Sequence, residues 1–138
     1  MAEIMKKRQD KGPDTYEVEG DTLYLVGSQC SECGAAFYPP QVVCARCGSR
    51  EGESLRLGPQ GVVYSWSRVH QSTPEFETPY VLAYVDFPQD VRVLVPLVKG
   101  AEPKVGMVVT LGMDQGPRRA ADEPGGLAMM VHVRPTDN

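Results

Sequence analysis

The chain has 138 residues, of which 41% are hydrophobic and 23% charged, and it carries a formal net charge of -4 with a pI of about 5.2. This length favours one domain, or two small modules that share one core. The acidic balance disfavours a nucleic-acid partner, because such proteins neutralise phosphates with Lys and Arg.

The first residues, 1–14, form a charged stretch that begins "MAEIMKKRQDKG". It has no apolar face to bury and no apolar segment of the kind found in a signal peptide, so we expect a flexible tail. No apolar run approaches the roughly 18 residues of a membrane span. We therefore expect a cytoplasmic protein without a membrane partner, whose cysteines stay reduced.

The next segment, 15–29, predicts a β-hairpin. Two β-rich runs flank a turn at Gly20–Asp21, and the second run leads directly into Cys30. A short strand is expected at 54–57, closed by Gly58 and Pro59. We therefore predict a first unit over 15–58, made of the hairpin and a four-cysteine segment, and a second unit over 59–138.

The four cysteines of the chain form two C-x2-C pairs, each followed by glycine: Cys30, Cys33, Cys44 and Cys47. Two such knuckles complete a tetrahedral four-thiolate site, and glycine permits the turn that each knuckle needs. Because four thiolates saturate the metal, we predict one structural Zn²⁺ per chain, with no open position for catalysis. Iron in a rubredoxin-like site is the main alternative, and a redox dithiol fits the pattern less well.

The stretch between the two pairs contains an apolar, proline-rich centre: Phe37, Tyr38, Pro39, Pro40 and Gln41. One interpretation is packing within the ribbon itself. The other is a rigid protrusion, shaped by the metal, that docks a partner protein.

From residue 61 onward the sequence alternates apolar and polar residues with period 2, which is typical of β-strands. Five strands are expected, at 61–70, 79–87, 91–98, 106–113 and 127–133. Pro96 favours an edge position or a bulge, 114–126 is expected to be a polar loop, and 99–105 is too short for a normal helix. We predict an all-β chain, with a rubredoxin-like zinc ribbon followed by a five-stranded OB-fold barrel, although sandwiches share these signals.

No catalytic set is visible in the sequence. There is no nucleophile elbow, phosphate loop or dinucleotide motif, and all four cysteines are assigned to the metal. The two histidines, His70 and His132, fall inside predicted strands. We therefore predict that the chain is not an enzyme on its own.

The order of elements, from "CSECGAAFYPPQVVCARCG" through "TPYVLAYVDF" to "KVGM", resembles the zinc-ribbon/OB-fold proteins of acyl-CoA metabolism, formerly a domain of unknown function. The resemblance covers about 28–134. Many members begin with a helix, whereas 15–29 here predicts a hairpin. The resemblance implies a thiolase-superfamily partner, in a heteromer formed around a thiolase dimer. The partner would carry the nucleophilic cysteine, while this chain stabilises the complex and shapes coenzyme A and substrate access in thiolysis or condensation.

In that function, the loop 71–79 lies against the partner, with Phe76 and Tyr80 as contacts beside the ribbon residues above. Contact with coenzyme A is assigned to four basic side chains: Arg68, His70, Arg118 and Arg119. A second hypothesis is a stand-alone acyl-CoA-binding protein that uses Arg68, Arg118 and Arg119 for the phosphates. A third is a single-stranded nucleic-acid-binding module, which the acidic balance disfavours.

Overall fold

The computed structural model describes residues 16–121 and 126–136, so the predicted tail at 1–14 lies outside the described residues. These residues form nine strands in two sheets and no helix. The expected absence of a helix over 99–105 therefore agrees with the structure. None of the described residues forms a helix long and apolar enough to cross a membrane.

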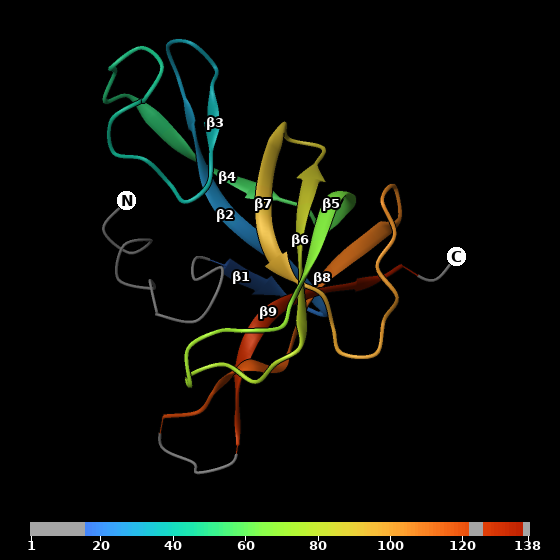
Figure 1. The fold of residues 1–138 in the computed structure, drawn as a ribbon. Helices are drawn as coiled ribbons and strands as arrows, with labels where there is room; N and C mark the ends of the chain where they lie inside the picture. The colour runs from blue at the N-terminus through green and yellow to red at the C-terminus, as the bar shows by residue number, and fades with distance from the viewer. Residues whose placement is uncertain (1–15, 122–125, 137–138) are drawn as a thin grey trace.

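The first sheet is built around one long strand, β2 (Thr22–Cys30), which pairs with three antiparallel neighbours. These are β1 (Tyr16–Glu19), β3 (Ala36–Phe37) and β4 (Gly52–Leu57). The predicted hairpin is confirmed, with Gly20 in the left-handed conformation (φ 63°) at its turn. In Figure 1 the outer end of β2, with β3 and the loops of the cysteine segment, extends away from the other strands at the upper left.

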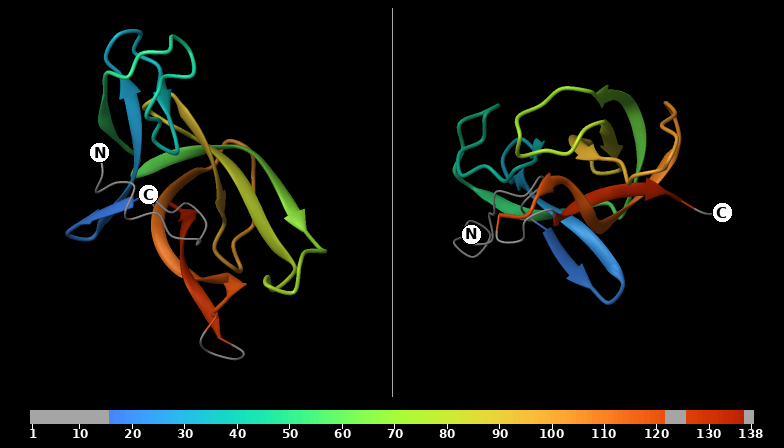
Figure 2. Two further views of the ribbon diagram at one scale, coloured as in Figure 1. Left: turned by 90° about the vertical axis from the view of Figure 1, so that its left-hand side faces the viewer. Right: turned by 60° about the horizontal axis from the view of Figure 1, so that its bottom comes forward.

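The second sheet has five strands in the order β7-β6-β5-β8-β9. They are β5 (Gln60–Val69), β6 (Tyr80–Phe87), β7 (Val91–Pro96), β8 (Val108–Arg119) and β9 (Leu127–Pro135). A parallel bridge between Leu97 and Val133 joins the end of β7 to β9. This connectivity is that of an OB-fold, here a curved half-barrel (Figure 2). Pro96 ends an edge strand, as predicted.

One hydrophobic core serves both sheets. Fully buried side chains of the half-barrel, such as Val85, Val109 and Val133, pack in one cluster with Leu25 of β2 and Leu57 of β4. The inner half of the first sheet therefore belongs to the core of the half-barrel, and only its outer half stands apart. The predicted boundary at 58/59 falls between β4, the last strand of the first sheet, and β5, the first strand of the second.

The strand β8 is longer than the sequence predicts. The expected loop 114–126 begins within this strand, which continues to Arg119 and pairs there with Leu127. Backbone hydrogen bonds explain the extension, since Glu77 N donates to Pro117 O (2.7 Å) and Arg119 N donates to Glu75 O (2.7 Å). The prediction that Arg118 and Arg119 stand in a loop is therefore wrong, because tertiary hydrogen bonds override the polar composition.

A β-bulge changes which side chains of β5 share a face. Strict alternation places Tyr64, Trp66, Arg68 and His70 together, but the register shifts between Val63 and Ser65. After the shift Trp66 lies opposite Ala83, which is buried, whereas Tyr64 lies on the outer surface under Arg92. One extra residue reverses the facing of all that follow. His70 lies one residue beyond the end of β5.

Candidate metal centre and partner surfaces

The four cysteines lie on two matching turns. Gly34 N donates to Cys30 O (3.0 Å) and Gly48 N donates to Cys44 O (2.9 Å), so each C-x2-C pair closes in the same way. Both glycines have a φ near +80°, as predicted for the turn after each C-x2-C pair. In the second turn the backbone N–H groups of Arg46 and Cys47 point at Cys44 Sγ, at 3.3 and 3.4 Å.

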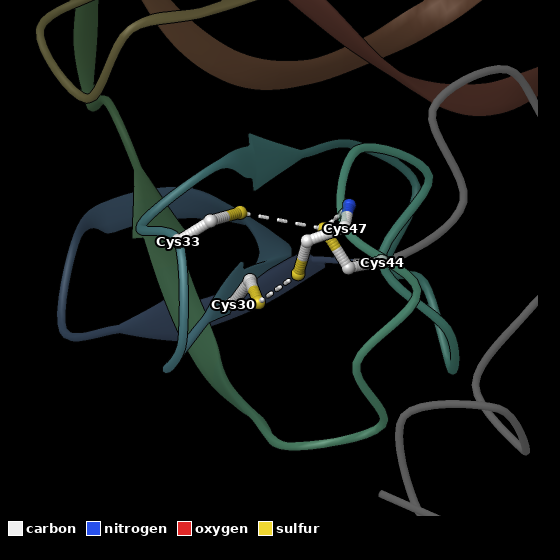
Figure 3. A group of neighbouring side chains, drawn as sticks. All are labelled: Cys30, Cys33, Cys44 and Cys47. Atoms are coloured by element: carbon white, nitrogen blue, oxygen red, sulfur yellow. Dashed lines mark hydrogen bonds between the residues drawn. The ribbon is translucent and has the colours of Figure 1, made fainter.

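The sulfur atoms converge on one point, as Figure 3 shows. Cys30 Sγ lies 3.6 Å from Cys47 Sγ, Cys33 Sγ lies 3.6 Å from Cys44 Sγ, and all four lie within 4.8 Å of one another. A tetrahedron with metal–sulfur bonds of about 2.3 Å has edges of about 3.8 Å. The donor set and its spacing therefore fit a single metal ion bound by four thiolates, with every ligand position taken.

The surroundings of the cysteines shift the pKa values of their thiols in different directions. The backbone N–H of Cys47, followed by that of Arg46, lowers the pKa of Cys44 to about 6 against the opposing effect of burial. The backbone N–H of Cys33 likewise lowers the pKa of Cys30. The Ser49 N–H lowers the pKa of Cys47, but the Cys30 sulfur and burial outweigh it and raise that pKa to about 12. A cluster of this kind ionises fully only when a cation balances its charge, so metal binding releases protons.

The ribbon residues predicted as a partner contact occupy different environments. Tyr38 packs against the hydrophobic core and so joins the ribbon to it, and Pro40 is buried. Phe37 and Pro39 are half-buried, and Gln41 is exposed, with its backbone N donating to Ser28 Oγ (2.9 Å). The most exposed apolar side chain of this stretch is Val42, 56% exposed, which is not among the predicted contact residues.

The loop between β5 and β6 is fixed along the end of β8. Phe76 forms a bridge with Arg118 and stacks on Tyr80, with ring centroids 5.9 Å apart. Arg119 Nε donates to Pro74 O (3.0 Å), and Arg118 lies 3.9 Å from a Glu75 carboxylate oxygen. Both arginines therefore hold the loop in place. Phe76 and Tyr80 are half-buried parts of the same contact.

The structure does not gather the four basic side chains that were assigned to coenzyme A. Arg68 lines a cavity beside the loop, with its guanidinium 5.8 Å from the Trp66 ring. His70 is exposed beyond the strand, and the other two arginines contact the loop. Contact of this group with coenzyme A stays a prediction.

A second surface emerges on the outer side of β5, β6, β7 and the first residue of β8, which we call the outer face. It consists of two neighbouring rows of the sheet, with Arg92 stacked over Tyr64 (3.4 Å to the ring centroid) and paired with Asp86. Its exposed apolar side chains are between 42% and 54% exposed: Val62, Tyr64, Tyr84, Leu94 and Val108. Exposed side chains alternate with buried ones along these strands. This period-2 pattern is the sequence signal that could have identified Val62, Leu94 and Val108 as exposed apolar residues.

Two family models match the chain in sequence. The rubredoxin-like zinc ribbon domain of ChsH2 matches residues 19–52, and the C-terminal OB-fold domain of ChsH2 matches residues 56–114. The solved structure of an Ltp2–ChsH2(DUF35) aldolase is also similar, with a TM-score of 0.62 and 30% identity, over 81% of this chain and 84% of that chain. The chain therefore belongs to the ChsH2/DUF35 family of zinc-ribbon and OB-fold proteins, as the resemblance implied.

Curated relatives include the benzoylsuccinyl-CoA thiolase subunit BbsA of Geobacter metallireducens, 38% identical over 62% of this chain and 59% of the relative. A DUF35 domain-containing scaffold protein of Methanocaldococcus jannaschii is 32% identical over 62% of this chain and 64% of the relative. The match thus spans about three fifths of the length of these proteins. These relatives are described as a thiolase subunit and as a scaffold protein, and the similar solved structure is described as an aldolase.

Proposed function

We propose that the chain is a non-catalytic accessory subunit of a thiolase-like acyl-CoA enzyme, which stabilises the complex and shapes the access of coenzyme A and substrate. The observation that carries this proposal is the likeness to the DUF35 component of an aldolase, which extends over both the ribbon and the half-barrel. Relatives described as a thiolase subunit and as scaffold proteins support the same assignment. A cytoplasmic location accompanies it as a prediction.

We assign the metal as one structural Zn²⁺ per chain, held by Cys30, Cys33, Cys44 and Cys47. Zn²⁺ commonly binds four cysteine thiolates in a tetrahedral structural site. Because the four thiolates fill the coordination positions, none is left for water or substrate. Metal analysis of the purified chain tests this point. One zinc per chain and a colourless protein are expected, whereas a red protein with iron in that proportion contradicts the assignment.

The side chains available for catalysis support a non-catalytic role. All four thiols converge on the metal centre. His132 is buried, with its Nδ1 hydrogen-bonded to the Met130 carbonyl, and His70 is exposed just beyond the end of β5. Thiolysis and condensation need a free nucleophilic thiol with an adjacent base. We therefore place the chemistry on the partner subunit.

Two surfaces of this chain suit the partner. The outer face offers exposed Tyr and Leu side chains, of which Tyr is enriched at protein interfaces. The exposed tip of the ribbon offers Val42 and Val43, held by the metal in one shape. In the proposed complex the loop 71–79, fixed along β8, borders the entrance used by coenzyme A.

The test is co-expression with a thiolase-superfamily subunit encoded beside this chain. We expect a stable complex on size exclusion, with thiolysis of acetoacetyl-CoA by the complex and none by this chain alone. The double variant Tyr84→Ser/Leu94→Ser should weaken the complex at least about 10-fold, because buried aromatic and aliphatic anchors carry most of an interface energy.

The matched control is Val18→Ser, which changes an exposed apolar side chain (58% exposed) on β1, away from the outer face. It should leave the complex intact. Turnover of an acyl-CoA by the isolated chain would contradict the proposed function. Failure to copurify with any thiolase-like subunit would contradict it equally.

A further inference from the structure

The open side of the half-barrel contains a cavity of about 540 Å³. It lies where the start of β6, the segment 97–102 after β7, and the strands β8 and β9 approach one another. Sites for small molecules in proteins have volumes of about 300–1,000 Å³. In OB-folds, the loops at this end of the barrel are those that bind ligands. The cavity therefore has the size and the place of a ligand site.

The walls of the cavity are fixed by hydrogen bonds of the backbone. Glu77 N donates to Pro117 O (2.7 Å) and ties the β5–β6 loop to β8, while Leu97 N donates to Val81 O (2.9 Å) and Val98 N donates to Val133 O (3.0 Å). These bonds hold three wall segments at their present spacing. A ligand would therefore enter a preformed space and would not have to order the loop first.

The lining combines apolar side chains with one unpaired cation. Pro79, Leu97, Pro117 and Leu127 form apolar walls. Lys99 is already paired with Glu77, at 3.6 Å between Nζ and the carboxylate. Among the described residues Arg68 forms no ion pair, and its guanidinium lies over the Trp66 ring. It is the lining group that is free to bind an anion.

A second polar group, His132, lines the cavity and is only 3% exposed. Its Nδ1 lies 3.0 Å from Met130 O, and because a carbonyl only accepts, Nδ1 donates this hydrogen bond, which makes Nε2 the acceptor nitrogen in that tautomer. Nε2 has no hydrogen-bond partner among the described residues. The described residues contain no buried side-chain nitrogen or oxygen without a hydrogen-bond partner. Since Nε2 has no partner, it must be accessible to solvent. Nε2 therefore opens on the cavity as an acceptor.

We propose that this cavity is a binding site for a small organic acid with an apolar body, whose carboxylate binds Arg68 and whose hydroxyl or N–H donates to His132. The apolar body lies against Leu97, Pro117 and Leu127. Glu102 stands at the exposed rim and opposes the negative charge. This site goes beyond the accessory role proposed above, because it belongs to the chain without its partner.

The test is an NMR titration of the full isolated chain with three related probes. We expect 3-(4-hydroxyphenyl)propanoate to bind with a Kd of about 1 mM or tighter. 3-Phenylpropanoate, which lacks the hydroxyl, should bind several-fold more weakly, and the methyl ester of the hydroxy acid about 10-fold more weakly. Amide shifts should be confined to the residues that line the cavity, 77–81, 97–102 and 115–117 together with Arg68, Leu127 and His132.

Variants separate the site from unspecific binding. Arg68→Gln should weaken binding of the acid about 10-fold and leave the ester unchanged, whereas Glu102→Gln should strengthen binding of the acid. Thr78→Trp, at the exposed rim, should block all three probes without filling the core. The control Arg134→Gln removes an exposed arginine of β9 outside the cavity and should change nothing.

Three outcomes overturn the proposal: no binding of the hydroxy acid up to about 10 mM, equal affinity for acid and ester, or unchanged affinity in Arg68→Gln. Because all measurements use the chain alone, failure to form a complex with a thiolase-like subunit leaves this result untouched. The converse also holds, since a chain without a ligand site can still form the complex.

Discussion

The zinc ribbon and the half-barrel are held together by different means within one chain. The core cluster of the half-barrel consists of aliphatic side chains and Phe87, and among the described residues it includes none between 26 and 56. In that interval the buried side chains include Cys30 and Cys44, two of the four that converge on the metal centre. A region that cannot bury enough apolar surface is thus organised by ligand bonds, while its neighbour relies on packing.

The boundary between the two means of stabilisation runs through the strands. The inner ends of β2 and β4 contribute Leu25 and Leu57 to the common core, and β2 ends at Cys30 in the metal centre. Loss of the metal should therefore affect the outer half of the first sheet, and loss of the core should affect both regions. The following predictions test this difference.

The largest effect is expected from Cys44→Ser. A hydroxyl is a poor zinc ligand, so the metal content should fall from one ion per chain to none. Amide signals of residues 30–52 should lose dispersion, while those of β5 to β9 keep it. Metal analysis and two-dimensional NMR measure the two parts of this result.

Ser49→Ala serves as its control, because this residue neighbours the second knuckle without belonging to the metal ligands. It should keep the metal. Collapse of the half-barrel signals in Cys44→Ser would show that the two regions fold only as one unit, contrary to the distinction drawn above.

The second effect is expected from Leu57→Ala, in β4. This side chain is fully buried in the common core, so its truncation should cost about 2–5 kcal/mol of unfolding free energy and lower the stability of both regions. Leu94→Ala, on the exposed outer face, should cost less than about 1 kcal/mol. Chemical denaturation measures both, and equal losses would place Leu57 outside the shared core.

A smaller effect is expected from Gly27→Ala, in the middle of β2. A Cβ at this position would lie 2.2 Å from the Phe37 carbonyl oxygen, so β3 has to move away. We expect a loss of about 1–3 kcal/mol and altered signals at Phe37 and Tyr38. Gly112→Ala, where a Cβ meets nothing within 4 Å, should be neutral or stabilising. Similar effects at both glycines would refute the close contact.

The smallest effect concerns the Asp86–Arg92 pair on the outer face. The hydrogen bond from Arg92 lowers the pKa of Asp86 below its usual value of about 3.9. The ionised carboxylate therefore stabilises the folded state at pH values above the unfolded-state pKa. This contribution is lost as the pH falls through the lower folded-state pKa. Because the pair is exposed, Asp86→Asn should cost less than about 1 kcal/mol at pH 7, and the difference from wild type should shrink as the pH falls below about 3.9. Glu53→Gln is the control, and a difference that does not shrink as the pH is lowered excludes the ion pair as its cause.

The sequence predicts much of this fold because its signals are local. The glycines after each C-x2-C pair, the turn at Gly20 and the period-2 strands each depend on neighbours within a few residues. The two C-x2-C pairs also predict that the four cysteine side chains converge on one metal site. The fold class and the family follow from these signals in combination with the order of the elements.

The errors arise where distant segments meet. The length of β8 depends on hydrogen bonds with Glu75 and Glu77, about forty residues earlier in the chain. The division of Tyr64 and Trp66 between two faces depends on one bulge, which no alternation pattern announces. The packing of Tyr38 against the core depends on the fold of the whole first sheet. None of these can be read from composition or spacing.

The strand β2 has a consequence for how this architecture diversifies. It is nine residues long, about 30 Å at full extension, and is anchored at one end by the common core and at the other by Cys30. The stretch Ala35–Val43 lies between the two knuckles, so substitutions or insertions near Val42 disturb neither anchor. Substitutions there can therefore change the surface that contacts a partner, while the same two anchors continue to set the position of the ribbon tip.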